Sequence, residues 1–188
     1  MRNRSVLAVV AHPDDEILGC GGALAKHINS GDSVAVLIMA DGESSRLTDI
    51  EQDAAKKIIT RQNNALSANL IIGVNQVKLM NFADNRMDGE ALLDIVRVIE
   101  NEINIHGPEI VYTHCSKDVN IDHTLVHEAV VVATRPQPGH PVKTLLFFEV
   151  PSSTEWRPGS SRPAFAPEWF ADISDSLEQK LKALAAYS

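Results

Sequence analysis

The apolar residues of this chain gather in short runs that are separated by longer amphipathic segments. An uninterrupted run of roughly four to eight apolar residues is typical of a parallel strand that is covered on both faces. Residues 5–11 (SVLAVVA) and 33–40 (SVAVLIMA) are of this kind. The pattern predicts strands at residues 5–11, 33–40, 76–80, 109–113 and 143–150.

Between these runs, apolar residues recur every three or four positions, which is the spacing of a helix with one buried face. Pro13 suits the first turn of the first helix, the acids that follow it suit its positive end, and Gly31 is a typical stop. A fifth helical pattern covers residues 174–187. Candidate caps precede the three helices between them: Thr48 (with Glu51 at capping-box spacing), Asp88 and Asp122.

Strands that alternate with helices imply βαβ units with right-handed crossovers. We therefore expect an α/β fold with a mostly parallel sheet of about five strands, in one domain over residues 1–188. Seven of the nine prolines lie between Pro136 and Pro167. This predicts a proline-rich extension over residues 136–170, made of extended loops rather than long helices.

Composition and charge place the chain among ordinary globular proteins. Hydrophobic residues make up 44% and charged residues 22% of the 188 residues. Lys plus Arg is 17 against 25 Asp plus Glu, and the net charge of −8 argues against a nucleic-acid-binding surface. We expect Cys20 and Cys115 to be free thiols, no secretory signal and no membrane span. The expected location is the cytoplasm, and a homo-oligomer is left open.

Histidine and acidic side chains follow two of the predicted strands, at residues 12–16 (HPDDE) and at residues 114–123. Parallel strands place ligands at their carboxyl ends, so the two segments are expected at one edge of the sheet. Two imidazoles and a carboxylate can hold a divalent metal and leave a position open for water. The alternative is that residues 12–16 only start a helix with favourable charges. Clustered acids repel one another unless a cation neutralises them, which favours the metal.

Two motifs resemble those of a known enzyme family. Residues 11–16 (AHPDDE), followed by GCGG at residues 19–22, are similar to the opening signature of the PIG-L/LmbE-like zinc-dependent de-N-acetylases. Residues 118–123 (DVNIDH) stand where that family places its Asp-His metal motif. The resemblance runs from about Val6 to the end of the chain.

The resemblance implies a Rossmann-like, three-layer αβα fold and a zinc ion held by His12, Asp15 and His123. Asp14 would then be the general base. The implied substrates are N-acetylated amino sugars, their conjugates and related amides, which makes the implied partner a small molecule. The same two-histidine, one-carboxylate set also accepts Fe²⁺, Co²⁺ or Mn²⁺.

The sequence departs from the family pattern in two places. Some members carry a histidine three residues before the last metal ligand, where this chain has Asn120. Either Asn120 acts only as a hydrogen-bond donor or His114 supplies the proton. Family chains also continue further, so a chain that ends at Ser188 is expected to be a truncated form or an unusually short member.

Weaker candidates surround these motifs. Arg61 and Arg86 are candidates to contact a substrate phosphate or hydroxyls, or they are solvated surface residues. Turn formation alone explains an Asp or Asn at a strand end. We expect ordinary packing for His127, and either a sugar-stacking wall or a loop residue for Trp156. The candidate substrate-binding residues are Arg61, Asp84, Asn85, Arg86 and Asp118.

Four functions compete on this evidence. The first is a metal-dependent hydrolase that removes an N-acyl group from an amino sugar, and it is the one we favour. The second is an Fe(II) oxygenase with the same metal ligands, although the strand–helix alternation is not the all-β barrel expected for it. The third is a nucleotide-binding module, which residues 19–22 do not fit because they lack the G-x-G-x-x-G spacing. The fourth is an inactive relative that serves as a binding or assembly subunit.

Overall fold

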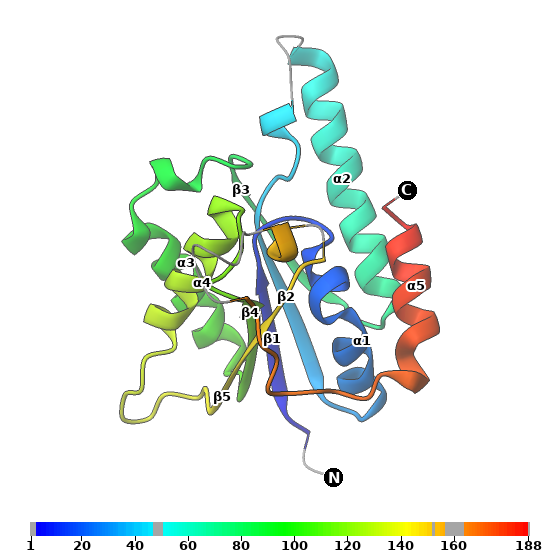
Figure 1. The fold of residues 1–188 in the computed structure, drawn as a ribbon, viewed down its shortest axis with the longest axis vertical. Helices are drawn as coiled ribbons and strands as arrows, with labels where there is room; N and C mark the ends of the chain where they lie inside the picture. Colours follow the sequence, from blue (N-terminus) through cyan, green and yellow to red (C-terminus); the bar gives the residue numbers. More distant parts are fainter. Residues whose placement is uncertain (1–2, 47–50, 152, 157–163, 188) are drawn as a thin grey trace.

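The computed structural model describes residues 3–46, 51–151, 153–156 and 164–187 (Figure 1). Its centre is a sheet of five parallel strands in the order β3-β2-β1-β4-β5. The α/β fold predicted from the sequence is therefore confirmed. The strands are β1 (Ser5–Val10), β2 (Ser33–Ala40), β3 (Gln76–Phe82), β4 (Ile110–His114) and β5 (Thr144–Phe148).

Helices cover both faces of the sheet and complete three layers (Figure 1). One face carries α1 (Asp15–Asn29), α2 (Glu51–Ile71) and α5 (Leu177–Ala185). The other face carries α3 (Leu92–His106) and α4 (Ile121–Ala133). Among the residues that the structure describes, no helix combines the length and the apolar character needed to cross a membrane.

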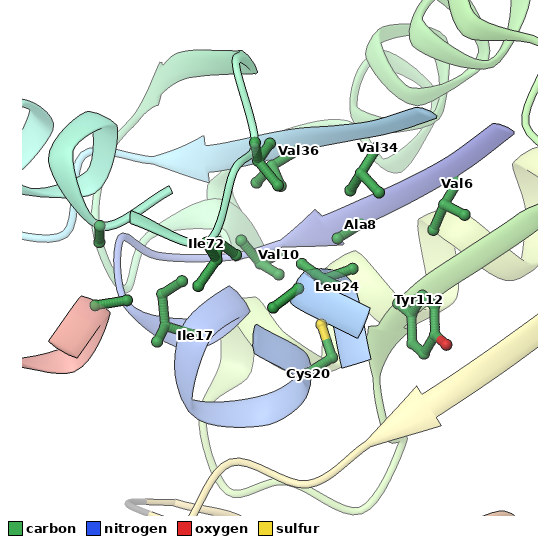
Figure 2. Close-up of a cluster of buried hydrophobic side chains, with 14 of the residues drawn as sticks. Val6, Ala8, Val10, Ile17, Cys20, Leu24, Val34, Val36, Ile72 and Tyr112 are labelled. Atoms are coloured by element: carbon green, nitrogen blue, oxygen red, sulfur yellow. The ribbon is translucent and has the colours of Figure 1, made fainter. Parts of the chain in front are cut away.

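The central strand β1 shows why the sequence folds in this way. Side chains alternate between the two faces of a strand, so an apolar run that is buried on both sides serves two cores. Val6, Ala8 and Val10 pack with α1, as Figure 2 shows, whereas Leu7 and Val9 pack with α3 and α4. The five side chains are at most 1% exposed.

The strand order places a reversal beside β1. The chain runs from β1 outward to β2 and β3, then returns to β4 on the other side of β1 and continues to β5. The carboxyl ends of β1 and β4 therefore flank a topological switch point, which is where open α/β sheets bind ligands. The loops that follow these two strands are the segments 11–14 and 115–120.

Several predicted element boundaries are wrong in detail. The third strand extends two residues beyond the predicted Met80, and the last strand ends at Phe148 rather than Val150. Asp88 does not cap α3, because it lies in a 3-10 turn and Ala91 is the N-cap. Asp122 does not cap α4, because Asn120 does. The predicted cap Thr48 lies outside the described residues.

Candidate metal centre

The loops after β1 and β4 meet at the carboxyl edge of the sheet. The backbone N–H of Ala11 donates a hydrogen bond to Nε2 of His114, the last residue of β4, at 2.9 Å. His12 follows in the first loop, and Asp15 opens α1. His123 lies in the first turn of α4. Residues that are about a hundred positions apart in the sequence thus face one another.

Three donor atoms converge between these loops. His12 Nδ1 lies 3.4 Å from Asp15 Oδ2 and 3.2 Å from His123 Nε2, and the Asp15 and His123 atoms are 3.2 Å apart. Ligands at about 2.0–2.1 Å from a tetrahedral zinc ion lie roughly 3.3 Å from one another. All three side chains are buried. Their donor types and spacing therefore fit a divalent metal of the zinc type.

A carboxylate stands behind each of the two histidines. His12 Nε2 lies 3.0 Å from Asp84 Oδ1 and 3.1 Å from Asp122 Oδ2. His123 Nδ1 lies 3.0 Å from Asp118 Oδ2. Such carboxylates accept the N–H of the outer ring nitrogen and leave the inner nitrogen as a lone-pair donor. The histidines are thus oriented as metal ligands.

The structure changes the interpretation of Asp84 and Asp118, which the sequence suggested as substrate contacts. Both are buried and face histidines, so they lie behind the ligands rather than in front of them. Sequence reasoning also missed Asp122, which accepts the backbone N–H groups of Asn85 (2.7 Å) and Met87 (3.1 Å) besides facing His12. The sign of this role in the sequence was that Asp122 directly precedes His123, a predicted ligand.

A second group of metal-type donors is formed by His12, Asp84 and Asp122. It uses the outer nitrogen of His12. The Asp122 oxygens already accept two backbone N–H groups, and Asp84 accepts the hydroxyl of Ser45. This group is therefore better suited to orient His12 than to hold an ion.

The surrounding charges set the proton affinities of the ligands. Burial lowers the pKa of His123, but the Asp15 and Asp118 carboxylates outweigh it and raise the pKa to about 9. The pKa of His12 is likewise raised, by Asp122, Asp15 and Asp84 against burial. Burial raises the pKa of Asp15, but the charge of His123 and the interaction with His12 outweigh it and hold that pKa well below its usual value. In the absence of a metal, protons therefore compete for the ligand nitrogens.

Asp14 lies beside the ligand set but in a different environment. Its side chain is 28% exposed, against 4% for Asp15. Burial and the charge of Asp15 raise the pKa of Asp14 to about 6, although Arg61 opposes the shift. The Arg61 guanidinium is ion-paired with the Asp14 carboxylate and also donates to the Pro13 carbonyl at 3.0 Å. Arg61, predicted as a substrate contact, is thus already bonded to the residue predicted as the base.

Arg61 also faces a cleft of about 480 Å³. The cleft lies along α2, and several of the side chains beside Arg61 are charged. The lining residues are Glu43, Lys56, Lys57, Thr60, Arg61, Asn64 and Tyr187.

Asn120 has two roles in the loop before α4. Its side-chain oxygen accepts the backbone N–H of Asp122 at 2.9 Å, which caps the helix. Its amide nitrogen donates to the side-chain oxygen of Asn85 at 2.9 Å. Asn85 and Arg86 are exposed next to it. These three residues therefore stand at the rim of the metal centre rather than among its ligands.

His114 is enclosed within the protein. Its ring is fully buried and stacks on His123 with the centroids 4.0 Å apart. Nε2 accepts the Ala11 N–H, and burial lowers the pKa of the ring well below its usual value. A neutral, enclosed imidazole does not fit the predicted proton donor. The contacts indicate a residue that holds His123 in place.

The remaining predictions have simple outcomes. His127 packs as expected, with its ring against Phe147 and Nδ1 2.9 Å from the His114 carbonyl oxygen. Cys20 and Cys115 are free and buried. Trp156 is 71% exposed, and its stacking role stays a prediction.

The fold and the site define a class of protein: a three-layer α/β protein with a buried His-Asp-His cluster at the topological switch point of its sheet. Residues 7–134 match the family described as PIG-L: GlcNAc-PI de-N-acetylase. The chain belongs to the PIG-L family, as its two motifs predicted.

Individual relatives extend the match beyond the family core. The Escherichia coli K12 protein named uncharacterized deacetylase YaiS is 33% identical over 189 residues, which cover 97% of this chain and 90% of that protein. Diacetylchitobiose deacetylase of Thermococcus kodakarensis is 26% identical, over 98% of this chain and 69% of its own. The solved structure of 4-carboxy-2-hydroxymuconate hydratase from Pseudomonas putida KT2440 is 25% identical, with a TM-score of 0.74 over 98% of this chain and 79% of that one.

Proposed function

We propose that this protein is a metal-dependent de-N-acetylase that releases acetate from an N-acetylated amino sugar or a conjugate of one. The observation that carries the proposal is the convergence of His12 Nδ1, Asp15 Oδ2 and His123 Nε2 at 3.2–3.4 Å, with a carboxylate behind each histidine. The names of its relatives YaiS and diacetylchitobiose deacetylase support the same reaction.

Zinc is the metal we favour for this site. Two imidazole nitrogens and one carboxylate oxygen form the donor set of many catalytic zinc centres, and they leave one position open. Fe²⁺ and Co²⁺ accept the same donors. When bound, a zinc ion polarises an amide carbonyl and lowers the pKa of a coordinated water to about 7.

Asp14 is the residue we assign as general base. It takes a proton from the attacking water, whose oxygen bonds to the carbonyl carbon. It then delivers that proton to the amide nitrogen as the C–N bond breaks, which yields acetate and a free amine. A carboxyl group with a pKa of about 6 is ionised at neutral pH and still basic enough for this transfer.

The rim residues supply polar contacts. The Asn120 side-chain amide donates a hydrogen bond to the carbonyl oxygen as negative charge develops there, and His114 takes no part in proton transfer. Asn85 and Arg86, which are exposed beside Asn120, contact the sugar hydroxyls. Arg61 contacts the substrate from the cleft side while it holds Asp14.

The test is metal analysis of the purified protein combined with acetate release from N-acetylglucosamine and N,N′-diacetylchitobiose under anaerobic conditions. We expect one zinc-type ion per chain and acetate release without oxygen, which an Fe(II) oxygenase would not give. An unsaturated tricarboxylic acid belongs in the panel, because a 4-carboxy-2-hydroxymuconate hydratase shares the fold. Hydration of that acid without acetate release would replace the proposal, and bound metal with neither reaction would indicate an inactive relative.

A further inference from the structure

Glu16 is a fully buried carboxylate that joins three distant segments. Its Oε2 accepts the backbone N–H of Asp14 at 3.1 Å. Its Oε1 accepts the hydroxyl of Tyr187 at 2.7 Å and the side-chain amide of Asn69 at 2.8 Å. Asn69 belongs to α2 and Tyr187 follows α5, which packs beside α1 and α2 (Figure 1).

Asp14 needs such support because of its backbone conformation. With φ at 107°, it occupies the left-handed region that residues with a side chain rarely adopt. A backbone of this kind persists only where surrounding contacts hold it. The Glu16 carboxylate supplies the contact at the Asp14 N–H. Arg61 supplies two more contacts, an ion pair with the Asp14 carboxylate and a hydrogen bond to the Pro13 carbonyl.

Tyr187 contributes to both of these supports. Its hydroxyl donates to Glu16, and its ring lies under the Arg61 guanidinium with Cζ 4.9 Å from the ring centroid. A tyrosine hydroxyl has one proton to donate, and here that proton is used on Glu16. The residue therefore reaches Asp14 by two routes without facing the reacting atoms.

We infer that Tyr187 is a positioning residue for Asp14: through Glu16 and Arg61, the segment after α5 holds the base in its left-handed turn. The inference rests on the proposed function in one respect, namely that Asp14 is the general base. A misplacement of about 1 Å in a reacting group can lower a rate about a hundredfold. A loosened Asp14 should therefore slow turnover more than it weakens substrate binding.

The first test is Tyr187→Phe, which removes the hydroxyl and keeps the ring over Arg61. Acetate release from N,N′-diacetylchitobiose should show kcat lowered about tenfold and KM changed less than about twofold, with unchanged metal content. The matched control is Tyr112→Phe. Tyr112 is the other tyrosine of the chain, and its hydroxyl bonds to His27 instead. The control should keep both constants, whereas a raised KM with unchanged kcat in Tyr187→Phe would overturn the inference.

A double-mutant cycle tests the route through Glu16. Glu16→Gln replaces one of the two acceptor oxygens with an NH2 group, so the hydroxyl of Tyr187 and the N–H of Asp14 no longer each have an acceptor oxygen of their own. If Tyr187 acts through Glu16, adding Tyr187→Phe to Glu16→Gln should lower kcat by less than about twofold. A full tenfold loss in both backgrounds would show that the hydroxyl acts elsewhere and would overturn the inference.

Crystal structures of zinc-loaded wild type and Tyr187→Phe give a readout that does not depend on activity. We expect the variant to lose the Asp14–Glu16 hydrogen bond and the left-handed φ of Asp14, with the metal ligands in place. If the wild type releases no acetate from any probe but this change occurs, the proposed function fails and the positioning role stands. An unchanged Asp14 in the variant overturns the positioning role whatever the activity.

Discussion

The two loops that build the metal centre are held in different ways. The loop after β4 ends in an ordinary helix start, in which the Asn120 side chain caps α4 and His123 follows in the first turn. The loop after β1 passes through a left-handed Asp14 that makes no side-chain cap for α1. Its support is partly local, because Glu16 in the first turn of α1 accepts the Asp14 N–H. The rest is tertiary: Arg61 of α2 pairs with the Asp14 carboxylate, and Tyr187 donates to Glu16. The α4 cap is thus a local contact, whereas the position of Asp14 also depends on tertiary contacts.

This difference separates metal binding from proton transfer. The proposed ligands His12, Asp15 and His123 lie against carboxylates and His114, and no contact of these groups with Tyr187 is found among the described residues. Asp14, whose pKa is raised to about 6, lies in the left-handed turn after β1. Changes to the first group should therefore remove metal, whereas changes to the second should remove turnover and leave the metal bound.

His123→Ala should have the largest effect. It removes one of three ligands and leaves the buried Asp118 carboxylate without its imidazole partner, so we expect loss of both bound metal and acetate release. Metal analysis after dialysis and the acetate assay measure the two losses. His140→Ala is the matched control, because that ring lies in the loop between α4 and β5 and contacts the carbonyl of Ala133 at the end of α4. Metal retained at wild-type level in His123→Ala would exclude His123 as a ligand.

Asp14→Asn should separate the two functions most clearly. The amide keeps the shape of the side chain but cannot take a proton, so kcat should fall about 10³-fold while the metal stays bound. Asp15→Asn, one residue further along, should lose the metal as well if Asp15 is a ligand as proposed. Kinetics and metal analysis of the pair test the comparison directly. Full activity in Asp14→Asn would remove that residue from the mechanism.

The sequence predicted most where the structure depends on local pattern. The apolar runs of β1 and β2 gave the central strands almost to the residue, because both faces of these strands are buried. The third strand was predicted two residues too short because the polar Asn81 interrupts the apolar pattern before Phe82. Asp88 and Asp122 look alike as helix caps, and only the packed structure shows that one lies in a 3-10 turn and the other faces His12.

The candidate site likewise has features that the sequence pattern predicts and features that depend on tertiary contacts. The strand pattern predicted that the segments at residues 12–16 and 114–123 meet at one edge of the sheet, and the three residues that the family resemblance implied as ligands lie together there. The roles of the residues around them depend on contacts that no spacing reveals. Tyr187 and Glu16 are 171 positions apart and meet only because α5 packs on α1 and α2. A fully buried His114 likewise follows from its stacking on His123.

Asp118→Asn should weaken metal binding at the loop after β4 without abolishing it. The amide oxygen can still accept the His123 N–H, but the negative charge that raises the basicity of that imidazole is gone. We expect metal affinity to fall about 10–100-fold, measured by competition with a chromogenic chelator. Asp94→Asn, which changes an exposed carboxylate paired with Arg97, is the control and should bind metal normally. Equal affinity in the two variants would contradict the orienting role of Asp118.

Substitutions of Asn120 should have the smallest effects on stability and turnover. They distinguish two roles of this residue, because its helix cap and its hydrogen-bond donor can be removed separately. Serine also caps helices, so Asn120→Ser should keep stability within a few tenths of a kcal/mol, whereas Asn120→Ala should lose about 1 kcal/mol. Both variants lack the amide N–H, and both should lose about tenfold in kcat if that donor meets the developing charge. Thermal unfolding and acetate release separate the two roles. If Asn120→Ser keeps full kcat, the loop after β4 serves the metal alone, and every proton and hydrogen bond of the reaction must come from the side of the strained turn.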